Sequence, residues 1–292
     1  MLNRTRLRLH SIRSGLRAAF LAAPSTIRGY RSNRNWPALN TEQEISEREN
    51  PLRDFFNSHW QGRGIWKWDH YFDIYDRHFK NFRGRDVVIV EIGIYSGGSL
   101  EMWRDYFGAN CRIIGVDIEP ACKVYESNSV RVFIGDQADR EFWKRLKQEV
   151  GTVDIVIDDG GHASQQQIIT LEEMLPQLNP GGVYLCEDIH GVFNGFTSYL
   201  QGLEQNLSAC DIASNPKSNE GCLVSSATEL QDAVWAVHTY PFMAVIERRK
   251  SPIGEFIAPK MGTQWQPFSP SSKSRSSSQR PEATDRGLKR DL

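Results

Sequence analysis

The feature of this sequence that most constrains its fold is an alternation of short β-branched runs with segments of helical apolar spacing. The β-like runs are Val87–Ile92, Arg112–Val116, Val130–Ile134, Val153–Ile157 and Gly182–Cys186. The helical segments between them are Leu100–Phe107, Arg140–Val150 and Gln165–Leu178. Strands that alternate with helices in this way form a parallel sheet with helices on both faces. The sequence therefore predicts an α/β fold with a Rossmann-like, doubly wound and mostly parallel sheet.

Two further parts are expected to complete this domain. Between Gly64 and Gly84, aromatic residues recur at three- and four-residue steps, which predicts a helix with one aromatic face. We interpret it as a lid on the core, with a packing helix that touches no ligand as the alternative. Later, the runs Val234–Thr239 and Met243–Glu247 flank Tyr240-Pro241-Phe242 and predict an antiparallel hairpin at the sheet edge.

The two ends of the chain differ in composition from its centre. Residues 1–41 contain eight arginines and no acidic residue, which resembles a mitochondrial transit peptide, a basic disordered leader or a lipid-contacting segment. Near the other end, seven serines lie between Ser269 and Ser278. The predicted organisation is a basic leader over 1–50, a helical lid segment over 51–84, a catalytic domain over 85–256 and a disordered tail over 257–292.

Composition limits the classes of function. With 292 residues, 39% hydrophobic residues and a net charge of −1, the chain can form one core and has no bias towards nucleic acid. Five scattered cysteines form no zinc or disulfide pattern, which favours a reducing compartment. No run is apolar enough to span a membrane. A cytoplasmic location is expected, with mitochondria as the alternative, and the sequence leaves a homo-oligomer open.

The first three predicted strands end in residues suited to a polar ligand. The first runs into a glycine turn, Gly93-Ile94-Tyr95-Ser96-Gly97, at a helix N-terminus, and its spacing differs from the dinucleotide fingerprint. The second ends in Asp117, which lies 24 residues after Gly93, a spacing typical of an acid that binds ribose hydroxyls. The third ends in Asp136-Gln137, which could reach an adenine ring, with a helix cap as the alternative for Asp136.

The fourth and fifth predicted strands end in acids and histidines. The fourth ends in Asp158-Asp159-Gly160-Gly161-His162 and the fifth in Glu187-Asp188-Ile189-His190. If these strands are neighbours, their acids converge on one end of the sheet, where they repel each other unless a cation neutralises them. Carboxylate-rich sites suit magnesium or manganese. The alternative is that one or two of the acids only cap loops or helices.

At these motifs the chain resembles the macrocin and mycinamicin sugar O-methyltransferases, a metal-dependent branch of the class I S-adenosylmethionine methyltransferases. The resemblance covers roughly residues 65–250 and includes the glycine turn, Asp117, the Gly135-Asp136-Gln137 and Pro180-Gly181-Gly182 motifs, and both acidic strand ends. One departure is Gly161, where relatives often have serine. The stretch after His190 matches no particular substrate.

The resemblance implies a set of roles for the site. Asp159, Glu187 and Asp188 would ligate Mg²⁺ or Mn²⁺, and His162 would be the general base. The expected S-adenosylmethionine-binding residues are Glu91, Gly93, Tyr95, Ser96, Gly97, Asp117, Asp136, Gln137 and Asp158. The expected reaction is metal-assisted methylation of a hydroxyl of a small molecule, a sugar moiety or another secondary metabolite. For His190, two roles stay open, a hydrogen bond within its loop and binding of the substrate. Trp68 and Tyr71 are candidate residues of the substrate pocket.

Two other functions remain open at the level of sequence. A metal-dependent, oxygenase-like enzyme would need two histidines and one carboxylate on an open face, which His162, His190 and Asp159 could supply. A non-catalytic binding protein on the same fold would retain the cofactor pocket without turnover. His70, His78 and His238 are expected in packing or surface roles.

Overall fold

The computed structural model describes residues 20, 23–32, 49–191, 193–210, 222–259 and 261. The chain forms two compact units, Met1–Glu49 and Asn50–Leu292. In the first unit, residues 23–32 are helical. Most of the expected leader and nearly all of the expected tail lie outside the described residues. Among the described helices, none is both long and apolar enough to cross a membrane.

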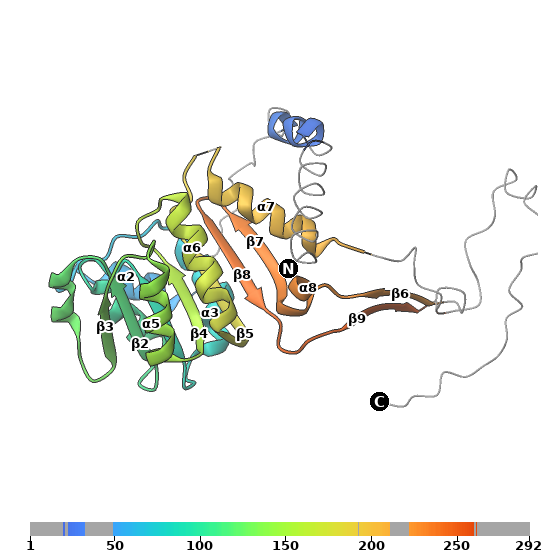
Figure 1. Cartoon of the computed structure of the whole chain (residues 1–292). Helices are drawn as coiled ribbons and strands as arrows, with labels where there is room; N and C mark the ends of the chain where they lie inside the picture. Colours follow the sequence, from blue (N-terminus) through green and yellow to red (C-terminus); the bar gives the residue numbers. More distant parts are fainter. Residues whose placement is uncertain are drawn as a thin grey trace, which may run out of the picture. The chain divides into compact units, whose positions relative to one another are not determined.

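A seven-stranded sheet forms the centre of the second unit (Figure 1). Its strand order is β3-β2-β1-β4-β5-β8-β7. The parallel strands are β1 (Val88–Ile92), β2 (Arg112–Asp117), β3 (Val130–Ile134), β4 (Val153–Asp158) and β5 (Leu178–Cys186). Each of the five predicted strands is present, and β4 lies next to β5, with Asp158 opposite Cys186. The predicted α/β sheet is therefore confirmed.

The antiparallel edge is also confirmed. Strands β7 (Val234–Tyr240) and β8 (Met243–Arg248) form a hairpin, and β8 pairs antiparallel with β5. A second, two-stranded sheet was not predicted from the sequence. It pairs β6 (Cys222–Ser226) with β9 (Glu255–Pro259), so regular structure continues past the domain end expected at residue 256.

Strand β5 begins earlier than its sequence indicates. Residues Asn179-Pro180-Gly181-Gly182 suggest a break before the strand, yet β5 already begins at Leu178. The register with β4 shifts between Val153 and Ile155, and Gly181 has a φ of 80°. An irregularity of this kind accommodates proline and glycine within a paired strand.

Helices cover both faces of the large sheet. The face that contains Ile89, Ile113 and Ile155 packs against α3 (Tyr71–Phe79) and α4 (Gly98–Phe107). The other face packs against α5 (Arg140–Val150), α6 (Ser164–Met174) and α7 (Gly195–Leu207), which lie in front of the strands in Figure 1. Two short helices, α2 (Pro51–Ser58) and α8 (Glu229–Ala233), complete the set. This arrangement explains why the central strands are apolar on both sides.

Helix α3 differs from the expected lid. It begins at Tyr71 rather than near Gly64, so Trp68 precedes the helix. Tyr71, Phe72, Tyr75 and Phe79 are all fully buried. The aromatic face therefore packs into the core, and the residues before it form an irregular segment. The interpretation of the helix as a lid stays a prediction.

The sheet order creates the place for a ligand. Strand β1 has β2 on one side and β4 on the other, so the chain changes direction across the sheet at β1. Open α/β sheets bind ligands beyond the carboxyl ends of their strands at such a switch point. The glycine turn follows β1, and Asp159 follows β4, so both lie at this position.

Candidate active site

A cavity of about 660 Å³ lies at the carboxyl ends of the parallel strands. It is bordered by residues after β1 to β5 and by the irregular segment that precedes α3. Of the predicted site residues, those that line it are Gly93, Tyr95, Ser96, Asp117, Asp136, Gln137, Asp159, His162, Glu187 and Asp188. Glu91, Gly97 and Asp158 do not line it. The candidate residues Trp68, Tyr71 and His190 do.

The turn after β1 is shaped by positive φ angles. Gly93 has a φ of 82°, and a Cβ atom there would collide with the backbone carbonyl of Asp159. Close approach of the β1 and β4 ends thus requires glycine at this position. The Asp117 carboxylate accepts from the backbone N–H groups of Tyr95 at 3.0 Å and Glu119 at 2.9 Å. Asp117 is therefore fixed beside the turn, and its oxygens retain lone pairs for a ligand.

Glu91 is a buried carboxylate beneath this turn. Its oxygens accept from the Ser99 hydroxyl and from the Trp103 indole N–H, each at 3.0 Å. Burial raises the pKa of Glu91 above its usual value. In this position Glu91 ties α4 to β1, while its contact with a cofactor stays a prediction.

Gln137 and Asp158 form a buried hydrogen-bond network under the cavity. The Gln137 amide donates to Asp158 Oδ1 at 3.1 Å, and its oxygen accepts from the Gly161 N–H at 2.6 Å. The Tyr184 hydroxyl donates to Asp158 Oδ2 at 3.0 Å. The network fixes the loop that ends at His162, so Asp158 acts on the site from below rather than from its surface.

Asp136 lies at the rim with its side chain turned to the backbone. It accepts from the Ala138 N–H at 2.8 Å, while Asp139 caps α5. The proposed helix-cap role therefore belongs to Asp139, and Asp136 forms a local turn beside the cavity.

Lys67 is the functional residue that the sequence analysis missed. Its ammonium group is 2.6 Å from Asp159 Oδ2 and 3.0 Å from Glu187 Oε2, and its side chain is only 3% exposed. Burial alone would lower the pKa of Lys67, but the carboxylates of Asp159 and Glu187 raise it. Burial, together with the charge of Asp159, raises the pKa of Glu187. Lys67 thus supplies part of the positive charge that the sequence assigned entirely to a metal.

Asp188 is the meeting point of the remaining polar groups. Its Oδ1 accepts from the Tyr71 hydroxyl at 2.9 Å and from the Trp68 indole N–H at 3.1 Å. His162 Nε2 lies 3.7 Å from Asp188 Oδ2, and His190 Nε2 lies 3.8 Å from Oδ1. These two separations are ion-pair distances and too long for hydrogen bonds. Both imidazoles therefore face the same carboxylate without a direct hydrogen bond to it.

The donor set fits a divalent ion at one position. One ligand atom each from Asp159, His162 and Asp188 lies within 4.8 Å of the others. Two carboxylates and an imidazole match the preferences of hard or borderline divalent ions. Lys67 contacts both carboxylate oxygens of Glu187 but only Oδ2 of Asp159, so the predicted role of Glu187 as a metal ligand would require Lys67 to move away.

Backbone strain is concentrated around this cavity. Among the described residues, the non-glycine residues with positive φ are Tyr95 (43°), His162 (55°), Asp188 (54°) and Phe242 (62°). The first three line the cavity, and the carbonyl oxygen of Phe242 lies 3.1 Å from the Tyr71 hydroxyl. Such conformations cost about 1–3 kcal/mol each and persist where the surrounding structure holds them, which is typical of functional sites.

Comparisons with known proteins agree with this geometry. Residues 90–189 match the family described as a methyltransferase domain. The chain is 32% identical over 64% of its length to the 8-demethyl-8-alpha-L-rhamnosyl tetracenomycin-C 2'-O-methyltransferase of Streptomyces olivaceus. It is 38% identical over 44% of its length to the mycinamicin VI 2''-O-methyltransferase of Micromonospora griseorubida. The resemblance stated from the motifs is confirmed.

A solved structure supports the same conclusion. The MycE methyltransferase of the mycinamycin biosynthetic pathway, solved in complex with Mg and SAH, is 26% identical, with a TM-score of 0.57 over 69% of this chain. The match covers 55% of that protein. The chain covers 52% of the S. olivaceus relative and 32% of the M. griseorubida relative. It therefore spans about half, or less, of the length of these relatives, and it has the α/β methyltransferase fold.

The buried Asp158 gives a testable dependence of stability on pH. Burial raises the pKa of Asp158 to about 6, although the hydrogen bonds from Tyr184 and Gln137 lower it in part. Between about pH 4 and 6 the folded protein holds a proton that the unfolded chain releases, so this group makes folding less favourable as pH rises. Relative to Asp158→Asn, the wild-type protein should lose about 3 kcal/mol of unfolding free energy over this window.

Urea unfolding of both proteins at pH 4, 5, 6 and 7 in the presence of EDTA measures that difference. Only its change with pH matters, because the substitution also alters hydrogen bonds at every pH. A constant difference across the series would show that Asp158 does not titrate in this range.

A second test concerns Lys67. In Lys67→Met, Asp159 and Glu187 lose their shared cation, and breaking a buried ion pair should cost about 3–5 kcal/mol in EDTA. Added Mg²⁺ should restore part of this loss, because an ion can then neutralise the released carboxylates. The control is Lys144→Met, since Lys144 pairs with Glu141 on the exposed face of α5 and should contribute much less than Lys67. Equal losses in the two variants, measured by urea unfolding, would contradict the assignment.

Proposed function

We propose that this chain, which carries a methyltransferase domain, is an S-adenosylmethionine-dependent O-methyltransferase that uses a divalent metal and acts on a sugar hydroxyl of a small molecule. The observation that most directly supports this proposal is that one cavity contains both the glycine turn with Asp117 and the group Asp159, His162 and Asp188. A donor-binding turn and a metal-type cluster thus share one enclosed space, as a methyl transfer between two bound reactants requires.

The donor side of the cavity is formed by β1 and β2. Asp117 would accept from the ribose hydroxyls, and the turn from Gly93 to Ser96 would allow the backbone to approach the amino-acid part of the donor. When bound, S-adenosylmethionine supplies an electrophilic methyl group. The solved relative in complex with SAH supports this choice of donor.

The acceptor side is formed by β4 and β5. A divalent ion held by Asp159 and Asp188 would lower the pKa of a coordinated hydroxyl. His162 would accept the hydroxyl proton at Nε2, which requires that this nitrogen not ligate the ion. Tyr71 and Trp68 orient Asp188 by donating to it, so they position the group that faces His162.

The mouth of the cavity suits a glycosylated acceptor. Trp66 is 89% exposed and Trp68 is 49% exposed, and both line the cavity. Exposed aromatic surface of this kind marks a ligand-binding site, and it can cover the apolar face of a sugar ring or an aglycone. Two of the relatives are named as O-methyltransferases of a rhamnosyl tetracenomycin and of mycinamicin VI. These names support a sugar moiety as the acceptor.

The geometry gives less support to an oxygenase. A site with two histidines and one carboxylate needs both imidazoles at one ion. Within the described part of the chain, the cluster at this cavity contains His162 but not His190. No observation favours a binding protein without catalysis.

Binding of the donor is the first test. Isothermal titration should give micromolar affinity for S-adenosylmethionine with or without Mg²⁺, because the donor side contains no predicted metal ligand. Asp117→Asn should weaken this affinity by at least about tenfold, the cost of a charge-assisted hydrogen bond. Asp139→Asn is the matched control, since it keeps a good helix cap outside the cavity. No binding by the wild-type protein would overturn the proposed function.

The role of His162 is tested separately. His162→Ala should lower kcat for methyl transfer by about 10²–10⁴-fold while the affinity for S-adenosylmethionine stays unchanged. His190→Ala, which removes the other imidazole near Asp188, should have a much smaller effect on kcat. Transfer of labelled methyl groups to a panel of glycosylated small molecules, at several acceptor concentrations, provides the measurement. A loss of donor affinity in His162→Ala would contradict its assignment as the base.

A further inference from the structure

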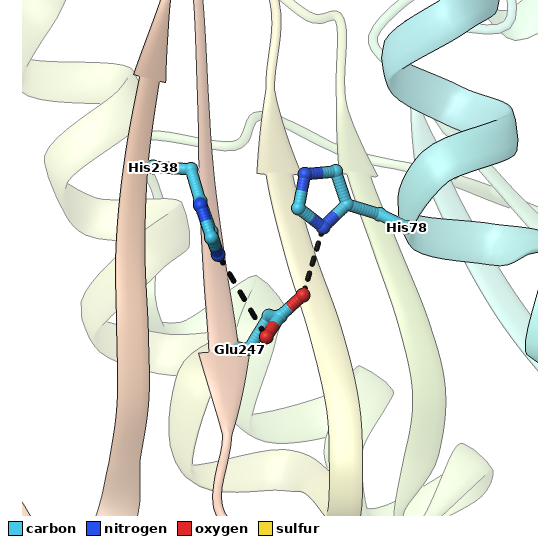
Figure 2. Close-up of side chains that lie close together, drawn as sticks. All are labelled: His78, His238 and Glu247. Carbon is cyan, nitrogen blue, oxygen red and sulfur yellow. Dashed lines mark hydrogen bonds and ion pairs between the residues drawn. The ribbon is translucent and has the colours of Figure 1, made fainter.

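A second cluster of metal-type side chains lies at the antiparallel edge of the large sheet. It consists of His78 from α3, His238 from β7 and Glu247 from β8, and we name it the edge cluster (Figure 2). One ligand atom from each residue lies within 4.8 Å of the others. None of the three lines the catalytic cavity. Figure 2 shows both imidazoles directed at the same carboxylate from two different elements.

His78 is held in a fixed orientation. Its side chain is 2% exposed, its Nδ1 lies 2.8 Å from Glu247 Oε1, and its Nε2 lies 2.9 Å from the Tyr240 hydroxyl. Burial lowers the pKa of His78, so the imidazole is neutral at neutral pH. A metal-bound histidine characteristically donates its other ring N–H to an oxygen acceptor, and the Tyr240 hydroxyl oxygen can accept in this way.

His238 lacks a hydrogen bond where one would be expected. Its Nε2 atom is buried and has no hydrogen-bond partner. It lies 3.7 Å from Glu247 Oε2, which is too long for a hydrogen bond. Two ligands of one tetrahedral zinc ion, each about 2.0–2.1 Å from it, are separated by about 3.3 Å. The spacing thus needs only a small movement to match two ligands of one ion.

We propose that the edge cluster is a zinc-binding site with His78, His238 and Glu247 as its protein ligands and water in the fourth position. Two imidazole nitrogens and a carboxylate are a donor set that zinc binds well. On binding, His78 would take the tautomer that is protonated at Nε2 and donates to the Tyr240 hydroxyl, so that Nδ1 offers its lone pair to the ion instead of donating to Glu247. The side chains of His238 and Glu247 are 31% and 28% exposed, so the cluster lies close to solvent, although His238 Nε2 itself is buried.

The position of the edge cluster indicates a structural role. Helix α3 contacts the β7–β8 hairpin at its first residue, where the Tyr71 hydroxyl lies 3.1 Å from the carbonyl oxygen of Phe242. An ion at His78 would join the same helix to both strands of the hairpin one helix length away. Helix α3 would then be held to the hairpin at two points, by Tyr71 at its beginning and by the ion at His78. The effect of zinc should therefore appear as stability before any effect on turnover.

Zinc stoichiometry and melting temperature test this proposal on the full chain. The wild-type protein is stripped with EDTA, dialysed, titrated with ZnCl₂ alone, and compared with His238→Gln and Glu247→Gln. Each variant should bind one zinc equivalent fewer than the wild type. At about a hundredfold excess of free zinc over its Kd, the wild-type melting temperature should rise by about 5–10 °C more than that of either variant.

Zinc at the catalytic cluster must be separated from zinc at the edge cluster. Asp188→Asn, alone and combined with His238→Gln, gives this control, because Asp188 belongs only to the catalytic cluster. In the Asp188→Asn background, adding His238→Gln should still remove one zinc equivalent.

The melting temperatures in EDTA show whether the variants are folded. Equal values for His238→Gln and wild type would show that this variant is folded, and if His238→Gln is not folded, Glu247→Gln is used in its place. If wild type, His238→Gln and Glu247→Gln bind equal zinc, the cluster is a hydrogen-bonded triad that binds no ion, and the proposal is wrong.

Discussion

The geometry of the candidate active-site cavity depends on how its acids are kept together. Parallel strands place Asp159 and Glu187 at the same end of neighbouring strands, where like charges oppose each other in a buried setting. Lys67 lies between them, although it is 92 residues from Asp159 and 120 residues from Glu187 in the chain. The ammonium group offsets the repulsion and anchors the segment before α3 to the sheet. The wall that carries Trp66 and Trp68 therefore depends on this ion pair.

A second layer of contacts keeps the loops of the site in place. Beneath the cavity, Gln137 joins the end of β3 to Asp158 and to the Gly161 N–H. This buried network holds the loop that forces His162 to a φ of 55°. Above, Tyr71 holds Asp188, whose φ is 54°. Strained residues on both sides are thus fixed by groups that do not need a ligand, which favours a site that is formed before binding.

Local patterns predicted the sheet well, because each strand carries its own signal. The runs that became β1 to β4 are β-branched, and their ends carry the glycine turn, Asp117 and Asp159. The beginning of β5 and the β6–β9 pair were missed, because proline and glycine inside a strand and pairing over long distances have no local signature. Asp158 and Asp159 show a further limit. Asp158, the last residue of β4, is buried below the cavity, while Asp159 lines it. The adjacent acids Glu187 and Asp188, which follow β5, both line it, so alternation along a strand does not sort acids that lie beyond the strand end.

Residues brought together by tertiary contacts were the least predictable part. Nothing in the sequence marks Lys67 among 35 lysines and arginines as the one that enters the acidic strand ends. His78 and Glu247 are 169 residues apart. From the sequence, His78 was expected in a packing or surface role, and Glu247 was given no role. In both cases the partner comes from α3 or the segment before it.

Helix α3 connects these observations. Tyr71, at its beginning, donates to Asp188, and His78, seven residues later, contacts Glu247. Seven residues of α-helix span about 10.5 Å, so the same rigid element reaches both the candidate active-site cavity and the edge cluster. The β7–β8 hairpin meets the helix at both positions, because the Phe242 carbonyl oxygen lies 3.1 Å from the Tyr71 hydroxyl and Glu247 lies 2.8 Å from His78. A shift of α3 along the hairpin would therefore disturb Asp188 and Glu247 together, and whatever fixes the helix at one end limits its movement at the other.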